Sequence, residues 1–271
     1  MTVTNGLVTL ADMLAYLPNS TNANTALLEQ AIEAASIAIC NYKGHFRPWY
    51  PIVQGKQFAI PMDRELALRA DLLETLSITN GDGNALDVAT YRMEPVNDYP
   101  KTSIVINNGA AIYWMMSTTT GWENAITVNG IWGYHAYDPQ AWQAASTISS
   151  AINASVTTVP VTSSTPYAAG QITRCGNELM LITAVATNSL TVIRGWNGST
   201  AAAHDILSTL TIWKTQGDVA RGCMIQTARY FRRNEAVFGT TGGGEMGVQP
   251  VIIPTLDPDV AAIMEPYVLR W

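Results

Sequence analysis

The stretch "ALLEQAIEAASIAICNYKG" (residues 26–44) decides how the rest of the chain is interpreted. Its apolar residues recur at helical spacing, which predicts a helix with one apolar face. Gly44 is a suitable stop for that helix, because glycine adopts the backbone conformation that helix ends favour. A helix with one apolar stripe is stable only when another element covers the stripe, so the chain must supply partners. The predicted face consists of Leu28, Ile32, Ala35, Ile39 and Tyr42.

A second, shorter helix precedes this one. In "TLADMLAYLP", Thr9 is the predicted N-cap, and Asp12 three residues later completes a pattern that resembles a capping box. Pro18 ends the helix, since the residue before a proline avoids helical geometry. The polar stretch "NSTNANT" then separates the two predicted helices.

The far end of the chain returns to helical patterns. The segment "TQGDVARGCMIQTARYFRRNEAVFG" places Val219, Cys223, Thr227, Tyr230 and Phe231 along one face. A last short helix begins at Asp257 as N-cap with Pro258 at the first helical position, and Pro266 ends it. Helices at both ends of the chain can therefore form one bundle.

The region between residues 45 and 137 has a different texture, with prolines and short alternating runs. Asn80-Gly81 and Asp82-Gly83 are hairpin signals. The runs "KTSIVINN", "AIYWMM" and "ITVNGIWGYH" are predicted strands. Residues 64–74 fit either a short helix or a strand.

A second β-rich stretch, residues 146–213, is rich in Thr, Ser, Val and Ala, with turns at Asn188-Ser189 and from Gly195 to Gly198. It is interpreted as a small inserted β-module. The predicted fold class is α+β: a helical bundle of the N- and C-terminal segments with β-hairpins, plus the inserted β-domain. The predicted parts are 1–145 and 214–238 (adaptor-like helices and hairpins), 146–213 (the module) and 239–271 (a C-terminal arm).

Composition limits the function classes. Charged residues make up only 13% of the 271 positions, about half the usual share, which suits a protein that buries much of its surface against partners. A net charge of −6 argues against tight, non-specific binding to nucleic acid. The three cysteines are widely spaced and are interpreted as buried free thiols made in a reducing compartment. No signal peptide and no run of 18 apolar residues is recognised, so a soluble protein made in the cytoplasm is expected.

No motif points to catalysis. His45, His135 and His204 lack metal-ligand spacing, and no GxSxG elbow occurs. The glycines between 239 and 247 do not form a phosphate loop, because a helix precedes them and no Lys follows within the run. We therefore expect no cofactor, no metal ion and no enzymatic activity.

The basic cluster Arg229, Arg232 and Arg233 leaves two interpretations open. Cations stabilise the last turns of a helix, and they can equally contact an acidic partner or passing DNA. Residues 239–271 are predicted to be an arm that reaches a neighbouring subunit or the portal, so that removing 250–271 spares the monomer. The alternative is that the short helix of this segment packs on its own chain. The candidate partner-binding residues are Arg229, Arg232, Arg233, Phe238, Ile252, Ile253, Ile263, Met264, Tyr267 and Trp271.

Taken together, these segments resemble the head–tail connector, or adaptor, proteins of tailed bacteriophages and gene transfer agents. The resemblance is carried by "TLADMLAYL", "LLEQAIEAASIAICNYKG", "LSITNGDGNALDVATYRMEP", "DVARGCMIQTARYFRRNEAVFG" and "DPDVAAIMEPY". It implies a structural virion protein of the neck, a ring of twelve copies docked under the portal, through which the genome is ejected. The implied partners are the portal protein, a tail or head-completion (stopper) protein, other copies of the chain and, transiently and without specificity, DNA; no membrane is implied.

The stretch "ELMLITAVATNSLTVIRGWNGSTAAAH" is similar to a small β-module that recurs in phage structural proteins. The matching positions are Glu178, Arg194, Gly195, Gly198 and His204, while Ser199-Thr200 supplies hydroxyls after Gly198. The resemblance implies a cross-strand pair of Glu178 with Arg194 and a packed His204, all structural.

Two other functions stay open at this point. One is a different virion β-protein, such as a tail, spike or glycan-binding component, in which residues 146–213 carry the function. The other is a hydrolase whose site is assembled from scattered residues, which the missing motifs disfavour.

Overall fold

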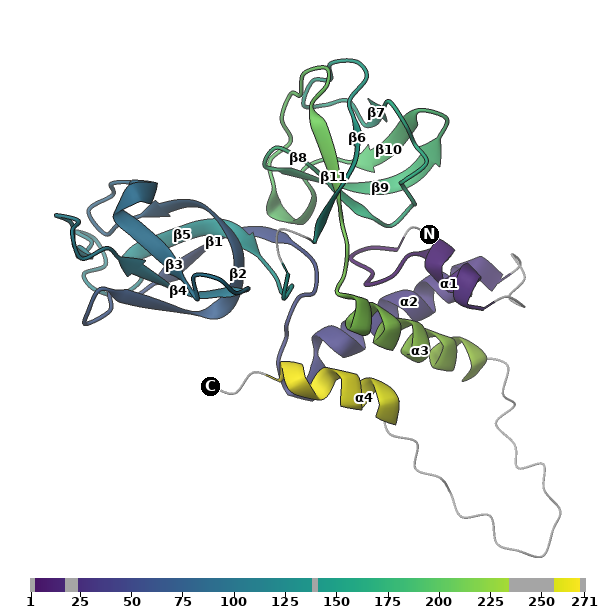
Figure 1. Cartoon of the computed structure of the whole chain (residues 1–271), viewed down its shortest axis with the longest axis horizontal. Coiled ribbons are helices and arrows are strands. Elements are labelled where there is room, and N and C mark those ends of the chain that lie inside the picture. The colour runs from purple at the N-terminus through teal and green to yellow at the C-terminus, as the bar shows by residue number, and fades with distance from the viewer. Residues whose placement is uncertain (1–2, 18–23, 138–140, 234–255, 269–271) are drawn as a thin grey trace, which may run out of the picture. The chain divides into compact units, whose positions relative to one another are not determined.

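The protein is described here from a computed structural model that covers residues 3–17, 24–137, 141–233 and 256–268. It is an α+β protein with four α-helices and two antiparallel sheets in that part of the chain (Figure 1). The chain divides into two compact units. The helical unit comprises Met1–Phe46, Ala168–Gly170 and Gly217–Trp271; the β unit comprises Arg47–Tyr167 and Gln171–Gln216.

The helices confirm the predicted segments at both ends of the chain. Thr9 caps the first helix, and its hydroxyl accepts a hydrogen bond from the Asp12 amide while the Asp12 carboxylate accepts from the Thr9 amide, as a capping box requires. Asp257 caps the last helix and Pro258 begins it, also as predicted. The helices are α1 (Leu10–Tyr16), α2 (Thr25–Cys40), α3 (Gly217–Arg233) and α4 (Pro258–Met264).

The core of the helical unit lies where α3 contacts α2 on one side and α4 on the other (Figure 1). Four residues of the predicted apolar face are buried in α2, namely Leu28, Ile32, Ala35 and Ile39, whereas Tyr42 lies in the turn after α2 and is half-buried. On α3, Val219, Cys223 and Thr227 are buried, and Tyr230 and Phe231 are half-buried. Gly222 lets the two C-terminal helices approach, because a Cβ there would already touch Val260 and Ile263. Segments about 180 residues apart in the sequence thus share one core.

One sheet has the strand order β1-β5-β2-β4-β3. Residues 64–74, which fit a helix or a strand from sequence, enter its longest strand, which runs from Glu65 to Thr79. The extended form is favoured because Leu66 and Leu68 alternate into one core, after which Leu72 and Leu73 point to two different clusters. The strands are β1 (Ile52–Phe58), β2 (Glu65–Thr79), β3 (Tyr91–Glu94), β4 (Lys101–Ile106) and β5 (Ile126–Trp132).

Residues 111–116 are a correction, since the predicted strand "AIYWMM" is not formed. Its backbone is bonded to a side chain instead of a strand: Asn80 donates to the Tyr113 carbonyl and accepts from the Met115 amide. Trp114 still enters the core, and its indole donates to the Arg64 carbonyl. In this run Trp114 is buried, whereas Tyr113, Met115 and Met116 are exposed.

The other sheet has the order β6-β11-β8-β9-β10-β7 and its own core, which includes Ile148, Met180 and Leu210. The predicted turns are confirmed: Asn188 adopts a positive φ between two strands, Gly195 precedes a short 3-10 turn, and Gly198 is the last residue of that turn. The strands are β6 (Trp142–Thr147), β7 (Thr158–Pro160), β8 (Ile172–Cys175), β9 (Glu178–Ala186), β10 (Ser189–Ile193) and β11 (Thr209–Trp213).

The two sheets contact each other through a smaller apolar cluster. Leu73 and Ile131 of the first sheet meet Ile172, Leu179 and Trp213 on the other side. An ion pair between Arg174 and Glu74 accompanies the cluster, with 2.6 Å between Nη1 and Oε2.

The part predicted as 1–145 is divided between the two units, because residues 1–46 lie in the helical unit and the rest in the β unit.

Candidate partner-binding site

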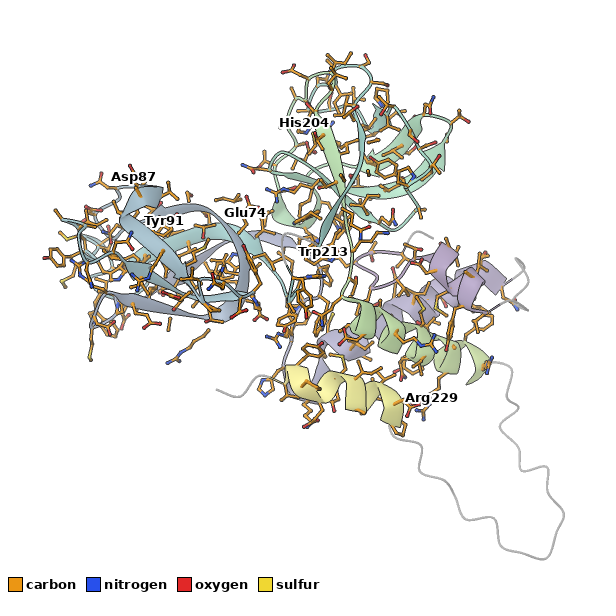
Figure 2. The ribbon with its side chains drawn as sticks, viewed as in Figure 1. Glu74, Asp87, Tyr91, His204, Trp213 and Arg229 are labelled. Carbon is orange, nitrogen blue, oxygen red and sulfur yellow. The ribbon has the colours of Figure 1, made fainter. Side chains whose placement is uncertain are left out.

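Arg229 of α3 lies beside the start of α4 (Figure 2). Arg229 is largely buried and forms an ion pair with Asp257, at 3.3 Å between Nη1 and Oδ2. One turn earlier, the buried side chain of Gln226 accepts a hydrogen bond from the Asp257 amide at 2.9 Å. Because Asp257 also caps α4, these contacts attach the beginning of α4 to α3.

The short helix α4 packs on its own chain, which is the intrachain alternative that the sequence left open. Val260 and Met264 are buried, so Met264 offers no surface to a partner. Tyr267 donates a hydrogen bond to the Asp218 carboxylate at the other end of α3. The ammonium group of Lys43 bonds both oxygens of Glu265, which attaches the end of α4 to the turn after α2.

The remaining candidates differ in position. Arg232 is exposed in the last turn of α3, where a cation stabilises the helix end and remains able to contact a partner. Arg233 is the last residue of α3. Ile263 is half-buried against Gly222. Phe238, Ile252, Ile253 and Trp271 lie outside the described residues.

The outer face of α2 is a feature that the sequence analysis missed. Leu27, Gln30, Ala34 and Ile37 recur at helical spacing and are exposed, with Leu27 at 41% and Ile37 at 62%. This set, called the α2 stripe from here on, carries no charge. The signal was present in the sequence: the face opposite the predicted apolar face lacks the charged residues that a solvated helix surface usually has.

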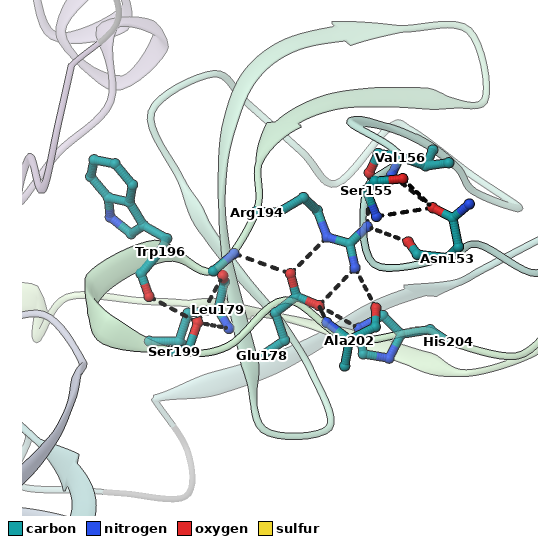
Figure 3. Close-up of polar contacts among 11 residues, drawn as sticks. Asn153, Ser155, Val156, Glu178, Leu179, Arg194, Trp196, Ser199, Ala202 and His204 are labelled. Atoms are coloured by element: carbon teal, nitrogen blue, oxygen red, sulfur yellow. Dashed lines mark hydrogen bonds and ion pairs between the residues drawn. The ribbon is translucent and has the colours of Figure 1, made fainter.

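The positions Glu178, Arg194 and His204 form one buried cluster in the β unit (Figure 3). The implied Glu178–Arg194 pair is confirmed, with two hydrogen bonds of 2.6 and 2.8 Å between guanidinium and carboxylate. His204 Nε2 lies 2.7 Å from Glu178 Oε2 and donates to it. The backbone amides of Gly195 and Ala202 complete the shell around the carboxylate.

The surroundings of this cluster favour a structural role. Glu178 is only 1% exposed, and burial alone would raise its pKa. The hydrogen bonds from Arg194, Ala202, His204 and Gly195 outweigh burial and lower the pKa of Glu178 to about 2. Arg194 also donates to the carbonyl oxygens of Asn153, Val156 and Ala202. The pair thus connects the loop at residues 153–156 with the loop at Ala202 by charge-assisted hydrogen bonds.

Other chemistry is limited in the described ranges. No group of three His, Cys, Asp or Glu side chains able to hold a metal ion occurs among them. The thiols of Cys40, Cys175 and Cys223 are buried, and burial raises the pKa of Cys223 to about 11, which leaves that thiol unreactive at neutral pH. None of the helices described here is long and apolar enough to cross a bilayer.

Comparison with known proteins adds no assignment. No protein-family description matches the chain, and no curated protein is significantly similar to it.

Proposed function

We propose that the protein is a head–tail adaptor: a structural virion protein that forms a ring under the portal and lets the genome pass. The observation that supports this most is which segments of the chain make up the helical unit. The segments around α2, α3 and α4, which carry most of the sequence resemblance to adaptors, fold against one another into one core. A bundle of the two chain ends with β-hairpins and an inserted β-domain is the arrangement we infer for the adaptor.

The α2 stripe is the surface that we assign to contacts between copies in the ring. Copies that each carry a net charge of −6 repel one another, so a subunit contact needs a surface without charge. The stripe meets this requirement, and from Leu27 to Ile37 it covers about 15 Å of helix at the usual rise per residue. A second copy of the chain is therefore the occupant that we propose for it.

The charge of the chain also fits a channel for DNA. Each phosphate that a protein neutralises adds affinity, and an acidic ring does not retain the genome that moves through it. Arg232, which is exposed at the end of α3, is the cation to which we assign a passing contact. No catalytic step is part of this proposal.

Binding to portal-bearing, tailless heads tests the proposal. Purified protein should co-sediment with such heads and not with heads that lack the portal. Ile37→Glu places a charge on the α2 stripe and should reduce both ring formation and head binding at least tenfold. Met62→Glu is the matched control, because Met62 is fully exposed in the β unit and receives the same charge. Equal sedimentation with portal-free heads would refute the adaptor function, and normal assembly of Ile37→Glu would refute the assigned surface.

A further inference from the structure

A cavity of about 420 Å³ lies in the β unit between two segments that are close in space. One wall is the turn that follows β2, from residue 80 to 90, and the other is the segment 111–115. The volume falls in the range of small-ligand sites. Neither the proposed ring nor the Glu178 cluster uses this cavity.

The two walls are held together without any ligand. Asn80 is only 4% exposed, and its amide donates to the Tyr113 carbonyl at 2.8 Å while accepting from the Met115 amide at 2.9 Å. Gly81 brings the backbones into contact, since a Cβ there would lie 1.9 Å from the Met115 carbonyl oxygen. The cavity is therefore preformed, which lowers the entropic cost of binding.

The polar atoms that line the cavity are mainly acceptors. Asp87 uses Oδ1 to accept from the Ala89 amide, and its Oδ2 has no hydrogen-bond partner among the described residues. Asn84 donates to Asp82, which leaves its own side-chain oxygen available. Tyr113 is 64% exposed and offers an aromatic face. A matching ligand must donate several hydrogen bonds, and its apolar side must fit the remaining lining of Ala85, Leu86, Ala111, Ile112 and Met115.

Charge narrows the ligand class further. Asp82 and Asp87 line the cavity and no Lys, Arg or His does, which disfavours phosphates and other anions. The guanidinium of Arg64 lies over the Tyr113 ring, 5.1 Å from its centre, and its positive charge there disfavours an ammonium ligand in the cavity. A neutral, hydroxyl-rich ligand with an apolar face satisfies all of these conditions.

We propose that this cavity binds a saccharide. Sugar hydroxyls donate to Asp87 and to the side-chain oxygen of Asn84, while the C–H face of the sugar ring lies on Tyr113 and the apolar lining. Asp87, labelled in Figure 2 with Tyr91, caps the 3-10 turn that leads into β3, so this acceptor is attached to the five-stranded sheet. The inference does not depend on the adaptor function, because it rests on residues outside the helical unit.

Saturation-transfer difference NMR on the full chain tests the proposal. The probes are glucose, galactose, mannose and N-acetylglucosamine, with inorganic phosphate and tetramethylammonium as charged comparisons. At least one sugar should give a saturable signal. Asp87→Ala and Tyr113→Ala should each weaken its binding at least tenfold, whereas Asp205→Ala, an exposed carboxylate outside the cavity, should not.

Two variants keep the test decisive, since Asp87 also caps a 3-10 turn and Tyr113 does not. Circular dichroism confirms that each variant is folded before titration. The proposal is wrong when none of the four sugars binds saturably, when both variants bind as wild type does, or when phosphate or tetramethylammonium binds in an Asp87-dependent manner.

Discussion

At the scale of single residues, the six-stranded sheet depends on one carboxylate that the chain surrounds with donors. Glu178 stands on β9, and its partners come from the end of β10 and from the loop that contains Ala202 and His204. Desolvating a carboxylate is costly, so this arrangement is stable only while the donors remain in place.

Arg194→Met should destabilise the six-stranded sheet by about 3–5 kcal/mol, because it leaves the Glu178 charge buried without its main partner. Amide hydrogen exchange of β9 and β10 measures the loss in the full chain. Arg92→Met is the matched control, since Arg92 forms an exposed pair with Glu94 on β3 and should cost less than about 1 kcal/mol. Equal exchange in the two variants would contradict the structural role of the cluster.

The pH dependence of the same segment has a defined sign. The pKa of Glu178 is depressed to about 2, so its contribution to stability is fully present above the ordinary value near 4.5 and is lost as the pH falls through about 2. Hydrogen exchange of β9 and β10, corrected for intrinsic rates, should therefore show no Glu178-dependent change between pH 8 and pH 5. Glu178→Gln should remove the acid-dependent loss below pH 4.5; an unchanged acid profile would mean that other groups control it.

Residue-level patterns were predictable where they are local. The N-caps of α1 and α4 could be predicted, because a cap involves neighbours in the sequence: Thr9 with Asp12, and Asp257 with Pro258. The partner of Arg229 was not predictable, since Asp257 lies 28 positions away and is already explained as a cap. The Glu178 cluster followed from the resemblance and not from spacing.

At the scale of elements, α4 is the case in which packing overrides a local interpretation. Seven residues of helix are unstable alone, which is why the sequence indicates that this segment needs a surface but not which one. The buried Val260 and Met264 assign it to α3 of the same chain. Removal of 250–271 is therefore now expected to weaken the helical unit instead of sparing the monomer.

Met264→Ala should destabilise the helical unit by about 2–5 kcal/mol, because it removes a buried side chain from the contact between α4 and the rest of the unit. Ala262→Ser changes an exposed position of the same helix and should stay within about 0.5 kcal/mol. Hydrogen exchange of α3 separates the two outcomes. Wild-type protection of α3 in Met264→Ala would show that α4 contributes nothing to this core.

Strands were predictable where alternation and turn residues agree, as in β4, β5 and the β9–β10 hairpin. Residues 111–116 failed because a side chain, Asn80, takes the place of a neighbouring strand. The cavity beside Asn80 has this same segment as one wall, and no local sequence pattern predicts the cavity.

At the scale of the whole molecule, the chain ends form one unit and the middle forms another. Helical periodicity at both ends predicts that they meet, because each apolar face needs a partner. The contact between the two sheets through Leu73 and Trp213 was not predictable, since either residue fits the core of its own sheet equally well. Assembly belongs to this scale too, and the uncharged α2 stripe is where we expect it to begin.

The most direct test of the adaptor function is the location of the protein in the particle. Electron microscopy of purified particles, with this protein labelled by a small gold-binding tag, should show label as a single collar at the portal vertex. Label at the tail tip or over the capsid surface would contradict the account and would favour a tail, spike or glycan-binding component instead.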